Sequence, residues 1–160
     1  MPAGDLTVDV ILPTHAGERW VGEAIQSVVR QSHPLWQLIV VDDCSPDATV
    51  ERVESLLQGD PDRISLLRLD RPHRAAGARM AGVARTKADL IAFLDQDDRW
   101  LPEKLARQVA CFAADPALAA AHTDVEIIDA EGAPRVGAAD RENASRARIA
   151  WGAGTGLSAV

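Results

Sequence analysis

Two groups of carboxylates in this 160-residue chain stand where they could share a bound cation. Asp95, Asp97 and Asp98 follow the apolar run LIAFL, and Asp42 and Asp43 follow the largely apolar run WQLIVV. Carboxylates this close together repel one another unless a positive charge shares their site. Several acids in one cleft favour a hard divalent cation with oxygen ligands, Mg²⁺ or Mn²⁺, over Zn²⁺. Such a cation usually keeps some of its waters and completes its shell with substrate phosphates.

Each of these patterns also has an ordinary structural explanation. The stretch DDCSPD could form only an Asx turn and a helix N-cap, and acidic pairs such as Asp95 and Asp97 are common in loops. No pairing indicates a ligand role for the four histidines, His15, His33, His73 and His122. What favours a shared site is the order of the acids, which follow one predicted strand and then another.

The elements that must position these acids alternate between short apolar runs and stretches with helical periodicity. Strands are predicted over residues 7–12, 36–41, 64–69, 90–94 and 118–128, and helices over residues 19–31, 75–87 and 102–114 and after Asp47. This alternation predicts an α/β fold with a mostly parallel sheet and helices on both faces. In such sheets ligands bind beyond the carboxyl ends of the strands. The stretch Pro13-Thr14-His15 and both acidic groups would therefore meet in one cleft if their strands are neighbours.

Composition argues against several other classes of protein. The net charge of −7 argues against a nucleic-acid groove, which needs clustered Lys and Arg. The N-terminus lacks the basic and apolar regions of a signal peptide, and no apolar run approaches the ~20 residues of a membrane span. Cys44 and Cys111 lie far apart and are expected to be free thiols in a reducing compartment. We therefore expect a cytoplasmic protein without a transmembrane segment, and peripheral attachment to a membrane stays open.

Two other functions of α/β sheets do not fit the order of the motifs. A nicotinamide-binding Rossmann domain requires G-x-G-x-x-G after its first strand, whereas PTHAGE stands there. A phosphatase or phosphorelay domain places its key acid after an early strand, commonly the first, and the first predicted strand ends without one.

The chain resembles the family 2 glycosyltransferases from Val8 to about Gly132. The motifs that carry the resemblance are VDVILPTH, QLIVVDDCSPDAT, LIAFLDQDDRWLPEKLARQV and HTDVEIID. It implies a Rossmann-like GT-A fold, and transfer of a sugar from a nucleotide diphosphate donor to an acceptor hydroxyl with inversion. The donor would commonly be a UDP-sugar, and the acceptor a saccharide or a lipid-linked molecule. Residues 1–132 would form the nucleotide-sugar-binding domain, and residues 133–160 would begin an acceptor-side region that is incomplete here.

The resemblance also implies a donor site and a metal site. It places six residues against the nucleotide sugar: Pro13, Thr14, Glu18, Asp43, Arg74 and Asp95. Within this set, Asp43 would accept hydrogen bonds from the base or ribose, and Arg74 would contact the diphosphate. Mn²⁺ or Mg²⁺ would be bound by the D-x-D motif, with Asp97 as its ligand and Asp95 facing the ribose or reaching the metal through water.

The chain departs from the family pattern at three places. Cys44 stands where the family commonly has Gly, so the turn there must be made with a Cβ. Arg79-Met80 stands where many members have Arg-Asn. No acid after Asp129 can be matched to the catalytic base, which we expect beyond Val160.

These departures leave a second function open. The chain could be a non-catalytic nucleotide-sugar-binding module or a remnant of an enzyme, and turnover of a donor separates these alternatives from a transferase. A nucleotide-binding half would also leave apolar surface uncovered, so a homo-oligomer is expected.

Overall fold

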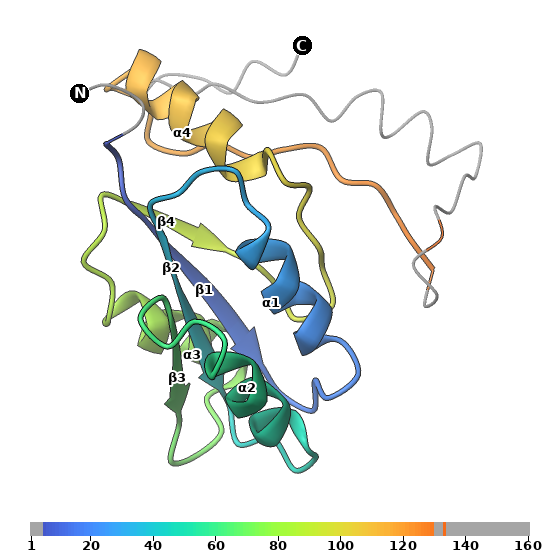
Figure 1. The fold of residues 1–160 in the computed structure, drawn as a ribbon. Coiled ribbons are helices and arrows are strands. Elements are labelled where there is room, and N and C mark those ends of the chain that lie inside the picture. The colour runs from blue at the N-terminus through green and yellow to red at the C-terminus, as the bar shows by residue number, and fades with distance from the viewer. Residues whose placement is uncertain (1–4, 130–132, 134–160) are drawn as a thin grey trace. The chain divides into compact units, whose positions relative to one another are not determined.

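The computed structural model describes residues 5–129 and 133 (Figure 1). The described elements are β1 (Val8–Thr14), α1 (Val21–Val29), β2 (Trp36–Asp42), α2 (Thr49–Leu57), β3 (Ile64–Arg68), α3 (Arg74–Val83), β4 (Leu90–Phe93) and α4 (Lys104–Ala114). The chain divides into two compact units, Met1–Ala106 and Arg107–Val160, with α4 crossing the boundary. The predicted functional boundary at residues 132/133 lies beside residues outside the described ranges and stays a prediction.

The first unit is built on a sheet of four parallel strands in the order β3-β2-β1-β4. The central strand β1 pairs with β2 from Val8↔Trp36 to Thr14↔Asp42 and with β4 up to Ile11↔Phe93. From β1 the chain moves outward to β2 and β3, then crosses to the other side of β1 to form β4. This reversal creates a topological switch point between β1 and β4, where open α/β sheets bind their ligands.

Helices cover both faces of the sheet because the central strands are apolar on both faces. Every residue of β1 is buried, and so is every residue of β2 except Gln37. On one face, Ile11, Ile39 and Val41 pack against Ala78 of α3. The side chains that alternate with these three are also buried, and α1 and α2 lie on their side of the sheet (Figure 1). The predicted parallel α/β sheet with helices on both faces is thus confirmed.

The predicted fifth strand over residues 118–128 is wrong. Among the described residues of that stretch, only Ile128 takes part in a β-bridge, and the others form neither strand nor helix. Val125 and Ile127 are 72% and 50% exposed. Alternating apolar residues indicate a strand only where a neighbouring strand can take up its N–H and C=O groups. Just beyond this stretch, the N–H of Asp129 donates to the oxygen of Ala133 at 2.9 Å.

The helices lie in the predicted stretches, and α1, α3 and α4 are shorter than predicted at one end or both. The clearest cause is at α3, which was predicted to reach Lys87 and ends at Val83. Beyond it, the N–H groups of Lys87 and Ala88 donate to Asp9 Oδ2 at 2.8 and 3.2 Å. Asp9 is a buried residue of β1, so its carboxylate fixes the chain at the entrance to β4. Over residues 5–129, no helix is both long and apolar enough to cross a membrane.

Gly82→Ala is expected to lower the free energy of unfolding by about 2 kcal/mol, because overpacking a well-packed core costs about 1–3 kcal/mol. A Cβ on Gly82 would lie 2.6 Å from Cγ2 of Ile11 and 3.2 Å from Cγ2 of Val41. The helix α3 would therefore have to move away from the sheet. Urea unfolding of the 160-residue chain measures the effect.

The matched control is Gly59→Ala, whose added Cβ would meet only the backbone oxygen of Leu56, at 3.4 Å. This variant should stay within about 0.5 kcal/mol of the parent, as surface changes usually do. Equal stability of Gly82→Ala and the parent would contradict the close approach of α3 to the sheet.

Candidate functional site

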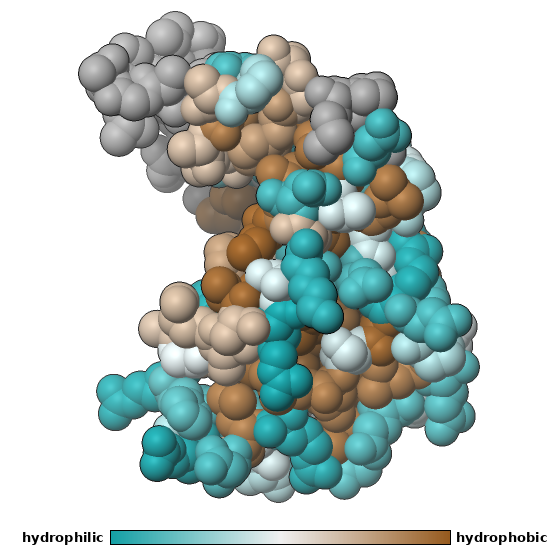
Figure 2. Space-filling model, turned by 90° about the vertical axis from the view of Figure 1, so that its left-hand side faces the viewer, coloured by the Kyte–Doolittle hydropathy of each residue, from teal (hydrophilic) through white to brown (hydrophobic). Residues whose placement is uncertain are grey.

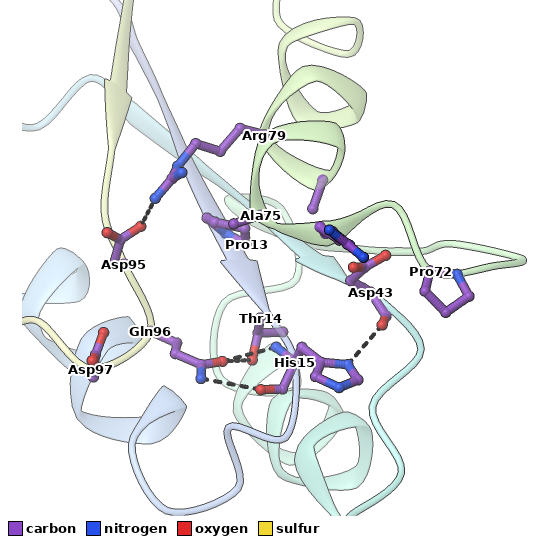
Figure 3. Close-up of a pocket in the computed structure, with 12 residues that line it drawn as sticks. Pro13, Thr14, His15, Asp43, Pro72, Ala75, Arg79, Asp95, Gln96 and Asp97 are labelled. Carbon is purple, nitrogen blue, oxygen red and sulfur yellow. Dashed lines mark hydrogen bonds and ion pairs between the residues drawn. The ribbon is translucent and has the colours of Figure 1, made fainter.

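A cleft of about 450 Å³ opens at the carboxyl ends of the central strands (Figure 3). Six of the seven residues predicted for the donor and metal sites line it: Pro13, Thr14, Asp43, Arg74, Asp95 and Asp97. They come from the ends of β1, β2 and β4 and from the start of α3. The acids that follow separate strands in the sequence therefore face one cleft, and they do so because those strands are parallel neighbours.

Glu18 is the predicted residue that does not line this cleft. Its side chain is exposed, and its N–H donates to Asp47 Oδ2 at 3.2 Å. The hydroxyl and N–H of Thr49 donate to the other oxygen of Asp47. These hydrogen bonds, with that of the Thr49 hydroxyl the largest effect, hold the pKa of Asp47 below its usual value. The role of Glu18 at the nucleotide stays a prediction.

Gln96, the middle residue of the D-x-D motif, fastens the loop after β4 to the end of β1. Its Oε1 accepts hydrogen bonds from the Thr14 hydroxyl at 2.7 Å and from the His15 N–H at 2.9 Å. Its Nε2 donates to the His15 oxygen at 3.2 Å. A Cβ on Gly17 would lie 2.5 Å from both Gln96 Oε1 and Thr14 Oγ1, so this contact requires glycine. The three hydrogen bonds hold the loop that carries the predicted metal ligands against the predicted nucleotide-binding residues.

Asp43 is buried and is held by three hydrogen bonds from two sides of the cleft. Its N–H donates to the Thr14 oxygen at 2.9 Å, and its own backbone oxygen lies 2.8 Å from Nδ1 of His15. Its Oδ1 accepts the N–H of His73 at 2.7 Å. Its Oδ2 has no hydrogen-bond donor among the described residues, so this oxygen is available to a ligand.

Three turns around the cleft hold non-glycine residues in the left-handed region of φ. They are Ala16, Cys44 and Arg74, with φ of 49°, 59° and 61°. Such strained residues cluster at functional sites. The turn at Cys44 is therefore made with a Cβ, as predicted, and its thiol donates to the Leu69 oxygen at 3.2 Å. Partial burial, followed by the nearby carboxylates of Asp43 and Asp42, raises the pKa of Cys44, so its thiol is protonated at neutral pH.

Opposite charges face each other across the cleft, as Figure 3 shows for Arg79 and Asp95. Arg79, on α3, forms an ion pair with Asp95, after β4. Asp97 is exposed and makes no hydrogen bond or ion pair within residues 5–129. The same holds for Arg74, at the first position of α3. Burial, and then the neighbouring carboxylates of Asp97 and Asp95, raise the pKa of Asp98.

The other six residues that line the cleft were not predicted as site residues, although His15 was placed at the cleft with the end of the first strand: His15, Pro72, Ala75, Ala78, Arg79 and Gln96. Gln96 had a signal, since it stands between the two acids of the motif. The ion pair of Arg79 with Asp95 had no such signal, because the spacing of residues in the sequence does not show how far a side chain reaches across a cleft.

The carboxylates present suit a hard divalent cation that is only partly ligated by protein. No cluster of three or more His, Cys, Asp or Glu residues that could hold a metal occurs in the described part of the chain. Asp95 and Asp97 line the cleft with carboxylate oxygens, and Mg²⁺ is typically bound through one or two carboxylates with waters and substrate phosphates. The donor set therefore fits Mn²⁺ or Mg²⁺ bound together with a phosphate ligand.

Comparison with known proteins gives a consistent family assignment. Residues 9–149 match the model of the family described as glycosyl transferase family 2. A putative teichuronic acid biosynthesis glycosyltransferase of Bacillus subtilis is 34% identical over 127 residues, which cover 79% of this chain and 50% of that protein. The UDP-Glc:alpha-D-GlcNAc-diphosphoundecaprenol beta-1,3-glucosyltransferase of Escherichia coli is 37% identical over 106 residues, which cover 66% of this chain and 41% of that protein. The chain thus spans half or less of the length of these two relatives.

Solved structures share the fold. A mannosyltransferase from Pyrobaculum calidifontis, in complex with GDP-Man and Mn²⁺, matches 91% of this chain and 41% of its own with a TM-score of 0.72 and 23% identity. Staphylococcus aureus TarS in complex with UDP matches 78% of this chain and 36% of its own with a TM-score of 0.64 and 23% identity.

Proposed function

The chain belongs to glycosyl transferase family 2, and on that premise we propose that its cleft binds a nucleotide diphosphate sugar and supplies the donor half of a glycosyl transfer. The observation that carries the proposal is the convergence of Thr14, Asp43, Asp95 and Asp97 from three parallel strand ends. The cleft volume of about 450 Å³ lies within the range of ~300–1,000 Å³ that is common for small-molecule sites. UDP and GDP-Man bound to the two solved relatives support a nucleotide ligand.

The nucleoside would lie at the ends of β1 and β2. Pro13 and Thr14 form a buried wall there, and Asp43 presents a carboxylate oxygen that no described residue occupies. A carboxylate accepts hydrogen bonds only, so Asp43 suits the N–H of a base or the hydroxyls of a ribose. Because its N–H and its other carboxylate oxygen are already bonded to protein, Asp43 would meet the ligand without rearranging.

The diphosphate would lie between α3 and the loop after β4. Arg74 and Ala75, the first residues of α3, line the cleft, so the positive end of the helix dipole faces it. Arg74 adds a charge that no other described residue neutralises. Asp97 and Asp95 would hold the divalent cation opposite. Bound there, the cation would act as a Lewis acid for the negative charge that develops on the leaving diphosphate.

Inversion at the sugar carbon requires the acceptor hydroxyl to attack from the face opposite the leaving diphosphate. A general base must take the proton of that hydroxyl, and no residue described here is assigned this role. We propose that the acceptor, a saccharide or a lipid-linked molecule, approaches the open side of the cleft. The chain's own residues would then contribute donor binding, orientation and charge balance.

UDP should bind this chain clearly tighter with Mn²⁺ than with chelator, as measured by titration calorimetry. Asp97→Ala should reduce the affinity with Mn²⁺ to the value seen with chelator, because it removes the metal ligand. Asp43→Ala should weaken UDP binding about 10-fold or more under both conditions, since a hydrogen bond to a charged group contributes about 1.5–3 kcal/mol.

The control for both variants is Asp62→Ala, which removes an exposed carboxylate outside the cleft. The unfolding transition of Asp43→Ala must match that of the parent, because Asp43 also accepts the His73 N–H. Parental affinity and metal dependence in both variants would show that the site is misplaced.

A non-catalytic nucleotide-sugar-binding module is the second candidate function, favoured by the lack of an assigned base among the described residues. Under this alternative the chain binds donors but forms no glycoside. We expect donor binding with little transfer when the 160-residue chain is incubated with nucleotide sugars, Mn²⁺ and candidate acceptors, because a positioned base typically contributes about 10²–10⁴-fold. Robust, metal-dependent glycoside formation would contradict this expectation and exclude the module.

We also propose that the chain forms a homo-oligomer through the outer edge of β4. No other described strand pairs with that edge, and Ile91 and Phe93 are 42% and 49% exposed. An open strand edge with apolar side chains is a template for pairing with another chain. Figure 2 shows apolar surface between polar side chains on the side of the molecule at the left of Figure 1.

Sedimentation of the parent should therefore show a species larger than a monomer at micromolar concentration. Phe93→Lys should shift it toward the monomer, because a charge on an edge strand opposes pairing. Ser55→Lys, on the exposed side of α2, is the control. A parent that is monomeric throughout the concentration range would disprove the proposal.

A further inference from the structure

Arg79 is a cleft residue to which neither the sequence motifs nor the proposed donor contacts give a role. It lies on α3, five positions after Arg74, and its guanidinium extends across the cleft to the carboxylate of Asp95 (Figure 3). Asp95 belongs to the D-x-D motif, so the ion pair connects α3 directly to the proposed metal site. A basic side chain bound to an acid of that site must affect how the site accepts a cation.

The ion pair can exchange partners at low cost. The side chains of Arg79 and Asp95 are 34% and 49% exposed, and exposed ion pairs contribute little to stability because water competes for both charges. A guanidinium binds phosphate as well as carboxylate, in both cases through paired N–H donors. A diphosphate in this cleft would therefore offer Arg79 a second partner of the same chemistry.

We propose that Arg79 makes binding of the divalent cation depend on binding of the diphosphate. The inference rests on the proposed function and adds a positioning residue to it. Without nucleotide, the guanidinium occupies Asp95 and places a positive charge at one of the two proposed metal ligands, which opposes the approach of a cation. With nucleotide, the diphosphate attracts Arg79, and the oxygens of Asp95 become available.

A coupling of this kind is reciprocal. If the nucleotide raises the affinity for the cation by some factor, the cation raises the affinity for the nucleotide by the same factor. The chain would then bind the free cation weakly and bind the cation and nucleotide together. If Arg79 had only a structural role, such as fixing the loop after β4, its removal would alter the affinities for the cation and for the nucleotide measured separately. The coupling factor between them would stay the same.

The test measures the coupling factor in variants of Arg79. Binding of Mn²⁺ alone is followed by the paramagnetic resonance signal of the free ion, and binding of UDP is followed by calorimetry with chelator and with Mn²⁺. In the parent we expect Mn²⁺ to raise the affinity for UDP by about 10-fold or more, within the usual range of coupling between sites. Arg79→Gln should bind Mn²⁺ alone several-fold tighter because the competing charge is removed. Its coupling factor should fall several-fold for the same reason, while direct coordination of the cation by the diphosphate keeps the remainder.

Two further variants complete the test. Arg79→Lys keeps the positive charge and should retain most of the coupling. Arg85→Gln removes an exposed arginine outside the cleft and should behave as the parent does. If Arg79→Gln lacks the cooperative unfolding of the parent, Arg79→Met replaces it in the test, because methionine keeps the apolar stem of the side chain. The same change in the coupling factor is expected of Arg79→Met.

The outcomes separate this inference from the proposed function. If the parent binds UDP with Mn²⁺ and a neutral Arg79 variant has the same coupling factor, the inference is overturned. The proposed donor site would be unaffected by that result. A parent without metal-dependent UDP binding would overturn the proposed function and this inference with it. A several-fold lower coupling factor in the neutral variants, with the parental factor largely retained in Arg79→Lys and Arg85→Gln, would establish the role of Arg79.

Discussion

The parallel pairing of β1 with β2 on one side and β4 on the other is the constraint on which the rest of the site depends. β1 is buried along its whole length, and its register with both neighbours brings three strand ends to the same edge. Thr14, Asp43 and Asp95 are far apart in the sequence, and this edge is where their chain segments meet. The site therefore inherits its geometry from the most buried part of the fold, which is also the part least able to deform.

The sheet brings the segments together, and side-chain hydrogen bonds set their separation. Gln96 binds the loop after β4 to Thr14 and His15, and Asp43 binds the end of β2 to His73 before α3. Each of these bonds joins groups from different elements, so the cleft walls are linked before any ligand arrives. Preorganisation of this kind raises affinity because fewer groups must be ordered when the ligand binds.

Much of the fold followed from the sequence because local patterns determine buried strands and amphipathic helices. The apolar runs that became β1, β2 and β4 predicted the strands, and those of β2 and β4 also predicted where the acids would lie. Residues 118–128 show the limit, because alternation specifies a face but cannot supply the partner strand. Within the site, charged and strand-end residues could be predicted from motif spacing. The contacts of Gln96 and Arg79 could not, because they depend on how far side chains reach between elements that only the folded chain brings together.

Strained backbone and opposing charges occur together at the edge of the sheet where β1, β2 and β4 end. Ala16, Cys44 and Arg74 have positive φ in turns that begin just beyond β1 and β2 or at the start of α3. Each such turn costs free energy that the packed sheet must offset, and each one directs the chain so that its polar groups face the cleft. The acids gathered there would repel one another, and the ion pair of Arg79 with Asp95 reduces that repulsion. A ligand that carries both a diphosphate and a cation can replace this contact, because the diphosphate would bind Arg79 and the cation would bind Asp95. The charges of the cleft would therefore be balanced both before and after such a ligand binds.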